Sequence, residues 1–196
     1  MPRPSQTRER RRKLMPVVAR TFAELGYRRT TTAELARRCK VQENILYRLW
    51  MDKKAMFIAA IEYVYERSAE IWGQLLREGD KGGSSAEVLL AYESKHHGEF
   101  GLYRIVFAGI SEFDDPDIRE AMASMYQLFQ KFIQQQITAH RKGRKSSLPD
   151  PALSAWAIVG LGTVANISRE LDLITDRKRR NLIANIGRVM LDGTVR

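Results

Sequence analysis

The sequence contains a single cysteine, Cys39, in 196 residues. One cysteine cannot form a disulfide within the chain, and no Cys/His cluster has the spacing of a metal site. The N-terminus also lacks the apolar stretch of a secretory signal, because residues 1–15 are rich in arginine. We therefore expect a cytoplasmic protein with no metal and no cofactor.

Long hydrophobic runs are scarce as well. The longest uncharged run, Pro151 to Ser168, is near the lower limit for a transmembrane helix and is interrupted by small and polar residues. We expect a buried helix of a soluble protein there, and no membrane partner. Strict alternation of apolar and polar residues is absent, so nothing indicates a β-sheet. Phosphate loops and nucleophile–base spacings are missing too, which argues against an enzyme and against catalytic residues.

Acidic residues are rare in the first quarter of the chain. Residues 1–54 contain 15 lysines and arginines but 5 aspartates and glutamates, whereas residues 55–196 contain 18 of each. The formal net charge of +10 therefore lies entirely in residues 1–54. This asymmetry is typical of a polyanion-binding module joined to a neutral body. Nucleic acid is favoured as the partner, and an anionic membrane surface is the alternative.

Apolar residues recur at helical spacing along nearly the whole chain, which predicts an all-α protein of about nine helices. The first helix is expected to begin near Met15 or to kink at Pro16, and to end at Gly26. Residues 1–13 would then form a flexible basic arm. The other helices are expected over residues 31–39, 42–51, 53–78, 84–97, 100–113, 115–140, 150–173 and 176–191.

The second and third of these helices, separated by Lys40 and Val41, predict a helix-turn-helix. The major groove of B-DNA admits one α-helix, and the N-terminal half of a recognition helix meets the base edges. Residues 42–48 are therefore candidate DNA contacts: Gln42 and Asn44 to adenine, Glu43 to cytosine, Ile45 to a thymine methyl, and Arg48 to guanine or phosphate. For Gln42 and Glu43, capping of their own helix is the alternative.

Thr31 and Thr32 stand at the start of the second helix, where a hydroxyl and free N–H groups suit a phosphate. Thr31 followed by Glu34 also has the spacing of a capping box. The basic arm is expected either to enter the minor groove or to raise non-specific affinity only.

The residues around this motif resemble the N-terminal signature of the TetR (tetracycline-repressor) family. The matching positions are Phe22 to Tyr27, Thr30, Thr31, Leu35, Ala36, Val41, Leu46, Tyr47, Trp50 and Lys53. The departures are Lys40 in place of a common turn glycine, Gln42, Trp50 and Pro16. The resemblance implies that Tyr47 and Lys53 clamp the DNA backbone. Packing on the fourth helix is the alternative for Tyr47, and a plain helix-start role is the alternative for Lys53.

The resemblance also implies a domain division. Residues 1–54 would be the basic arm and DNA-binding domain, and residues 55–196 a larger helical domain for effector binding and dimerisation. The run Ala155 to Ile167 and a second apolar stripe from Leu182 to Met190 predict a two-fold homodimer through the last two helices.

A mixture of aromatic rings and thioethers in the middle helices suits a largely apolar pocket, although the same residues could simply fill the core. The candidate effector-binding residues are Trp72, Tyr92, Tyr103, Phe107, Met125, Tyr126, Phe129 and Trp156. We therefore expect a ligand-responsive repressor that a small, largely apolar molecule releases from a palindromic DNA operator. An effector-independent architectural DNA-binding protein is the alternative.

Overall fold

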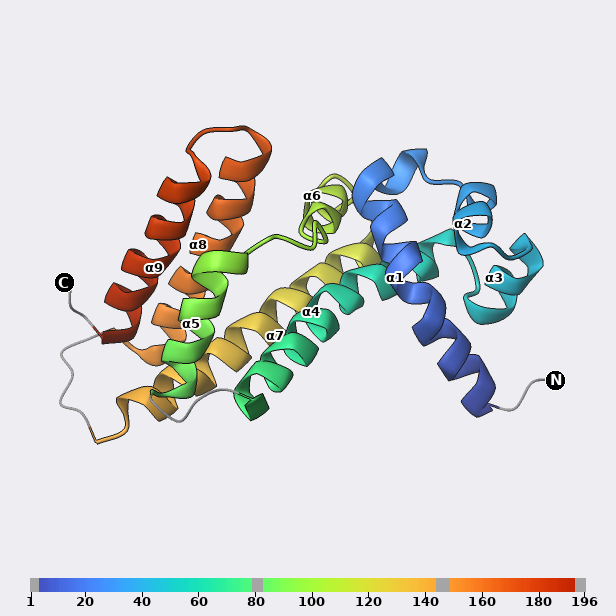
Figure 1. Cartoon of the computed structure of the whole chain (residues 1–196). Helices are drawn as coiled ribbons and strands as arrows, with labels where there is room; N and C mark the ends of the chain where they lie inside the picture. Colours follow the sequence, from blue (N-terminus) through green and yellow to red (C-terminus); the bar gives the residue numbers. More distant parts are fainter. Residues whose placement is uncertain (1–3, 79–82, 144–148, 193–196) are drawn as a thin grey trace. The chain divides into compact units, whose positions relative to one another are not determined.

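The computed structural model describes residues 4–78, 83–143 and 149–192. The regular secondary structure of these residues is entirely α-helical and comprises nine helices (Figure 1). They are α1 (Pro4–Arg29), α2 (Thr32–Cys39), α3 (Glu43–Leu49), α4 (Lys53–Glu78), α5 (Ser85–His96), α6 (Arg104–Ile110), α7 (Pro116–Arg141), α8 (Pro151–Glu170) and α9 (Asp176–Asp192). The predicted all-α fold is confirmed.

The chain divides into two compact units. Unit 1 contains Met1–Arg67 and Phe100–Met125, and unit 2 contains Ser68–Glu99 and Tyr126–Arg196. The helices α4 and α7 therefore contribute residues to both units. This division follows packing and not function, so the functional boundary expected at residue 54 remains a prediction.

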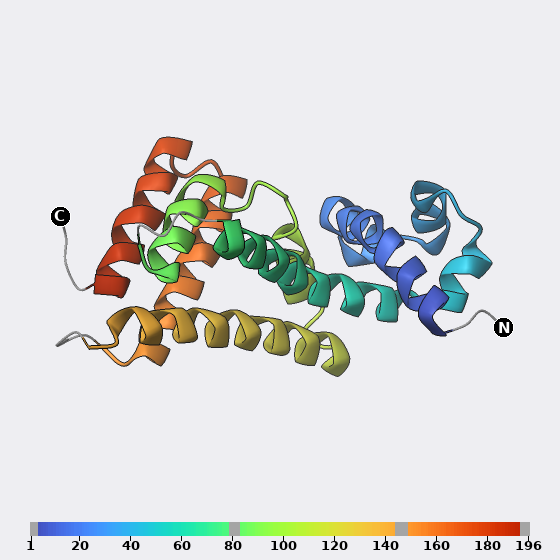
Figure 2. The same cartoon turned by 60° about the horizontal axis from the view of Figure 1, so that its bottom comes forward.

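In unit 1, α1 packs against α2, α3 and α6 (Figure 2). Val18, Phe22, Leu35 and Leu46 are completely buried, so one apolar core joins the first three helices. Phe57 from the start of α4 completes this core, and its ring centroid lies 4.9 Å from that of Phe22. The core fixes the position of α3 relative to α1 and α2.

In unit 2, α9 packs along both α5 and α8, and Figure 1 shows the three helices side by side. Ala86, Ile137, Ala155 and Leu191 form a buried cluster to which α5, α7, α8 and α9 each contribute one residue. The small side chains of Ala86 and Ala155 allow the helices to approach closely, so the helices of unit 2 form a bundle.

The start of α1 differs from the expectation. The helix begins at Pro4 and passes through Pro16, so the described residues 4–13 are helical and are not an extended arm. Exposed residues with good helix propensity, including an ion pair of 2.8 Å between Lys13 Nζ and Glu9 Oε1, stabilise this segment. Residues 1–3 of the expected basic arm lie outside the described residues. The expected break at Gly26 is confirmed, because its φ of 73° and ψ of 171° are not helical.

Most predicted helix starts are confirmed by their side-chain caps. Ser84 and Glu87 form both hydrogen bonds of a capping box. Asp115 accepts from the N–H groups of residues 117 and 118, and Asp150 accepts from that of residue 152. Local polar residues followed by proline or an acidic residue therefore predict where these helices begin.

Three helices are shorter than predicted, and one of them is α8, which was expected to reach residue 173 but ends at Glu170. The expected helix over 42–51 is α3, which ends at Leu49 because Trp50 has an extended backbone. The expected helix over 100–113 is α6, which begins only at Arg104. Gly98 and Gly101 have φ values of 74° and 67°, so the chain before α6 turns instead of continuing a helix.

The helix α8 was expected to be buried, but one of its faces is exposed in the single chain. Leu153, Trp156 and Val164 are 64%, 46% and 52% exposed. By length and composition alone α8 could cross a membrane, which is weak evidence because helices of soluble proteins pass the same test. An exposed apolar helix face of this kind is typical of an interaction surface.

Candidate nucleic-acid interface

The turn between α2 and α3 is closed by backbone hydrogen bonds. The Thr31 hydroxyl accepts from the Glu34 N–H at 3.1 Å and so caps α2. Lys40 follows α2 with φ of 54° and ψ of 44°, which is a left-handed conformation, at the turn position where the TetR-like pattern often has glycine. The Val41 N–H then donates to the Ala36 carbonyl at 3.0 Å. Lysine in the turn is therefore compatible with the helix-turn-helix.

The outer face of α3 and its N-terminal cap are polar and exposed. The exposed candidates are Thr31, Gln42, Glu43, Asn44, Tyr47 and Arg48, and the partly buried ones are Thr32, Ile45 and Lys53. The opposite face is buried through Leu46 and Leu49. All nine predicted DNA-contacting residues thus belong to α2, α3, their caps and the first residue of α4.

A short chain of hydrogen bonds joins α2 to α3 on this face. The Tyr47 hydroxyl donates to Thr32 Oγ1 at 3.2 Å, and Thr32 Oγ1 donates to Glu43 Oε2 at 2.8 Å. Gln42 is the N-cap residue of α3 but makes no side-chain cap hydrogen bond. The amide of Gln42 is therefore not committed to capping, whereas the carboxylate of Glu43 is oriented by α2.

Lys53 lies at the end of this surface, in the first turn of α4. Its Nζ donates to the Tyr27 carbonyl at 3.2 Å and lies 4.4 Å from the centroid of the Tyr27 ring. An ammonium group has three donors, so this contact leaves donors for a further acceptor. Tyr27 thus holds Lys53 at a fixed position beside α3.

Several basic residues of this region are paired within the protein. The Glu34 carboxylate accepts from Arg37 and Arg38, and these hydrogen bonds, that from Arg37 first, lower the pKa of Glu34 to about 2. Arg38 also pairs with Glu24. The sequence analysis missed these pairs, although the i,i+3 and i,i+4 spacings from Glu34 are a signal for them.

Two further pairs involve acidic residues from later in the chain. Lys54 Nζ lies 2.5 Å from Asp117 Oδ2 and 3.1 Å from Asp115 Oδ2, and these hydrogen bonds, that to Asp117 first, raise the pKa of Lys54. Arg28 Nε lies 2.8 Å from Glu112 Oε1. No local sequence signal predicts these pairs. The net positive charge left for a polyanion is therefore concentrated at the start of α1, where residues 8–13 include five basic residues and one acidic residue, whereas α3 carries one of each.

The predicted effector-binding residues fall into two groups. In unit 2, Trp72 is buried, its ring centroid lies 5.8 Å from that of Phe129, and its Nε1 donates to Glu93 Oε1 at 2.7 Å. Tyr126 and Thr163 hydroxyls are 3.4 Å apart. Tyr92 lies beside His96, with ring centroids 4.6 Å apart.

The remaining candidates lie elsewhere. In unit 1, the rings of Tyr103 and Phe107 form an edge-to-face pair, and Met125 is buried. Trp156 belongs to unit 2 but lies on the exposed face of α8. The structure therefore brings Trp72 and Phe129 together in one unit and Tyr103 and Phe107 in the other.

A protein-family model described as "Bacterial regulatory proteins, tetR family" matches residues 18–60. These residues contain the second half of α1, all of α2 and α3, and the first turns of α4. The match therefore covers the helix-turn-helix described above. No curated protein matches the chain.

Several solved structures have a similar fold over most of their length. A TetR-family regulator from Cytophaga hutchinsonii has a TM-score of 0.77 and 17% identity and covers 99% of this chain and 98% of its own. FadR from Bacillus subtilis in complex with stearoyl-CoA has a TM-score of 0.70 and 16% identity, with coverages of 93% and 98%. AibR in complex with isovaleryl coenzyme A and operator DNA has a TM-score of 0.65 and 14% identity, with coverages of 90% and 97%.

An exposed polar recognition helix on a three-helix core, followed by a larger helical region, defines a DNA-binding regulator of the helix-turn-helix type. Residues 18–60 thus match the tetR-family model, and the chain has the fold of TetR-family transcriptional regulators. The resemblance inferred from the N-terminal residues is thereby confirmed.

Proposed function

We propose that the protein is a homodimeric, cytoplasmic repressor that binds a palindromic operator and is released by a small, largely apolar effector. The observation that carries the proposal is the polar, solvent-exposed face of α3, held by a fully buried core formed with α1 and α2. Recognition of base edges in the major groove requires a helix in a fixed position whose polar side chains are free to form hydrogen bonds with the bases.

The DNA-binding roles follow from position on this face. Gln42 and Asn44 are exposed at the N-terminal end of α3 and carry amides that can pair with adenine. Arg48, one turn after Asn44, reaches guanine or phosphate. Tyr47 and Lys53 contact the phosphate backbone, and their hydrogen bonds to Thr32 and Tyr27 hold them in place before DNA arrives.

The dimer forms through α8 and α9. Leu153, Trp156 and Val164 lie on one exposed face of α8, and Ile186 of α9 is 41% exposed. Gly160, also exposed on α8, lacks a side chain and allows a partner helix to approach closely. Two copies packed through these faces would bury the apolar surface that a single chain leaves in water.

The effector site is supported by the aromatic group around Trp72 in unit 2. The Trp72 ring stacks on Phe132 with centroids 4.8 Å apart and meets Phe129 at its edge. Two proteins of the same fold were crystallised with acyl-CoA molecules, which favours the acyl chain of an acyl-CoA as the apolar group that binds here. Because α4 begins at Lys53 and also carries Trp72, a ligand that shifts α4 would move a DNA-contacting residue.

We expect a matching acyl-CoA to lower operator affinity by about 5–150-fold, which corresponds to a coupling of ~1–3 kcal/mol. The measurement is a titration of acyl-CoAs of increasing chain length into the preformed operator complex. Phe129→Ala should retain operator binding and lose much of the response, whereas the control Phe113→Ala, at an exposed position between α6 and α7, should respond normally. If compounds that bind tightly leave operator affinity unchanged at saturation, the effector-independent architectural function is correct instead.

A further inference from the structure

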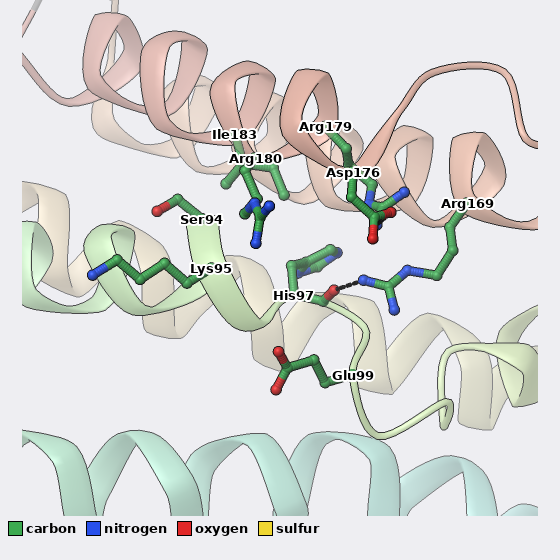
Figure 3. Close-up of a pocket in the computed structure, with 9 residues that line it drawn as sticks. All are labelled: Ser94, Lys95, His97, Glu99, Arg169, Asp176, Arg179, Arg180 and Ile183. Atoms are coloured by element: carbon green, nitrogen blue, oxygen red, sulfur yellow. Dashed lines mark hydrogen bonds and ion pairs between the residues drawn. The ribbon is translucent and has the colours of Figure 1, made fainter.

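Unit 2 contains a cavity of about 120 Å³ where the end of α5, the end of α8 and the start of α9 meet (Figure 3). This volume is many times the roughly 10–15 Å³ that one water molecule needs. It is well below the roughly 300–1,000 Å³ of a site for a complete organic ligand. The cavity therefore suits a single compact group of several heavy atoms.

The charged residues that line the cavity are mainly basic. The cations are Lys95, Arg169, Arg179 and Arg180, and the carboxylates are Glu99 and Asp176. Residues 55–196 as a whole carry equal numbers of acidic and basic residues. A local excess of two positive charges around one cavity is thus a departure from the composition of this part of the chain, and it favours an anion.

Two of the lining arginines, Arg169 and Arg179, are held in place by contacts within the protein. Arg169 donates to the backbone carbonyls of His97 at 2.6 Å and Gly98 at 3.3 Å, at the C-terminal end of α5. Arg179 has a side chain only 7% exposed, and it pairs with Asp176, whose side chain is 76% exposed. A guanidinium has five N–H donors, so the pair with Asp176 leaves donors of Arg179 for a further acceptor.

The imidazole of His97 also lines the cavity, and hydrogen bonds at both ring nitrogens hold it in place. Its Nε2 lies 3.0 Å from the Gly162 carbonyl of α8, and its Nδ1 lies 2.8 Å from Glu93 Oε2. Glu93 also accepts from Trp72, so these contacts tie α5 to α4 and α8. The cavity is therefore framed by hydrogen bonds and does not depend on loosely placed surface side chains alone.

Arg180 supplies the available donors. It makes no hydrogen bond or ion pair with the residues that the structure describes, and Figure 3 shows its guanidinium directed from α9 toward His97. Lys95 points away from the middle of the cavity in the same view. A guanidinium presents its N–H groups as a planar fork that matches the oxygens of a phosphate.

We propose that this cavity binds a phosphate-like oxyanion, with Arg180 as the principal donor and Arg169 and Arg179 as the surrounding positive charge. The phosphate is either free in solution or part of a larger molecule such as coenzyme A, whose remainder would lie outside the cavity. This binding does not require the apolar effector site around Trp72, and it is measured without DNA.

The test is calorimetric titration of the full-length protein with inorganic pyrophosphate and, separately, with coenzyme A that carries no acyl chain. We expect saturable binding that Arg180→Ala weakens about tenfold or more, as for loss of a charge-assisted hydrogen bond. Arg177→Ala is the matched control, because Arg177 is an exposed arginine of α9 that does not line the cavity, and it should change the affinity less than twofold. Arg180 is exposed, so its replacement should leave the melting temperature of the free protein unchanged.

Equal weakening by Arg180→Ala and Arg177→Ala would mean that the anions respond only to overall charge, and it would overturn the proposal. Absence of saturable binding by the wild-type protein would overturn it as well. If binding depends on Arg180, tighter binding of coenzyme A than of pyrophosphate would identify an organic phosphate as the ligand, and equal or weaker binding would identify the free ion. Neither outcome bears on DNA binding, so failure of this site leaves the proposed repressor function intact.

Discussion

Replacing Val164 with arginine is expected to convert the protein from a dimer to a monomer. Val164 is 52% exposed in the single chain, so an arginine there can remain in water and should not unfold the protein. In the proposed dimer the same side chain would be an unpaired buried charge, which costs about 3–5 kcal/mol, or roughly 150-fold or more in the dimer dissociation constant. Sedimentation or light scattering at micromolar concentration measures the change.

Thr138→Arg is the control for this substitution, because Thr138 is exposed on α7 and gains the same charge outside the proposed interface. It should remain dimeric. The Val164→Arg monomer should also lose most of its operator affinity, since two recognition helices roughly 34–36 Å apart must act together on a palindrome. A wild-type protein that is monomeric at micromolar concentration, or a Val164→Arg variant that stays dimeric, would refute the interface.

Asn44→Ala is expected to change which base the protein prefers, whereas Tyr47→Phe and Lys53→Ala should weaken binding to all sequences alike. Asn44 is exposed at the N-terminal end of α3, where a lost amide contact costs about 1–3 kcal/mol at one base pair. Contacts to phosphate carry no sequence information, so their loss lowers specific and non-specific affinity together. Titrations with operator and random DNA at fixed salt distinguish the two patterns.

Asn181→Ala is a matched control for the asparagine, because Asn181 is exposed on α9 and is not part of the DNA-binding surface. Melting temperatures of Tyr47→Phe and Lys53→Ala should be compared as well, since each removes a hydrogen bond, to Thr32 or to Tyr27. Equal losses on operator and random DNA for Asn44→Ala would show that this residue does not read a base.

The parts of the fold that the sequence predicted correctly are those with a local cause. Thr31, Ser84, Asp115 and Asp150 each cap a helix through hydrogen bonds to residues two or three positions later. Such signals lie within one turn of helix and can be recognised without tertiary information. The same holds for the helix break at Gly26.

The parts of the fold that the sequence did not predict depend on contacts between residues far apart in the sequence, or on a local energetic cost that the rest of the helix offsets. The pairs of Lys54 with Asp115 and of Arg28 with Glu112 join residues more than 60 positions apart. The first helix was expected to begin near Met15 or to kink at Pro16; it begins at Pro4, so the expected start is wrong, and the kink stays a prediction. Likewise, apolar composition alone could not distinguish a buried α8 from one with an exposed face.

The candidate site shows the same limit. Amphipathic periodicity was sufficient to place the polar residues of α3 on one face, because that face is local to a single helix. The basic cavity was not recognised, since its lining residues are spread from Ser94 to Ile183 and meet only through the packing of α5, α8 and α9. A run of basic residues at the start of α9 was present in the sequence but by itself indicates only a solvated surface.

The central claim is that the exposed face of α3 reads a specific DNA sequence as part of a two-fold dimer. Selection of bound sequences from a random pool of double-stranded DNA tests this claim most directly. The account predicts enrichment of a palindrome with half-sites about one helical turn or a multiple of it apart, and loss of a preferred base in each half-site for Asn44→Ala. A pool that remains random after repeated selection, despite measurable binding, would contradict it.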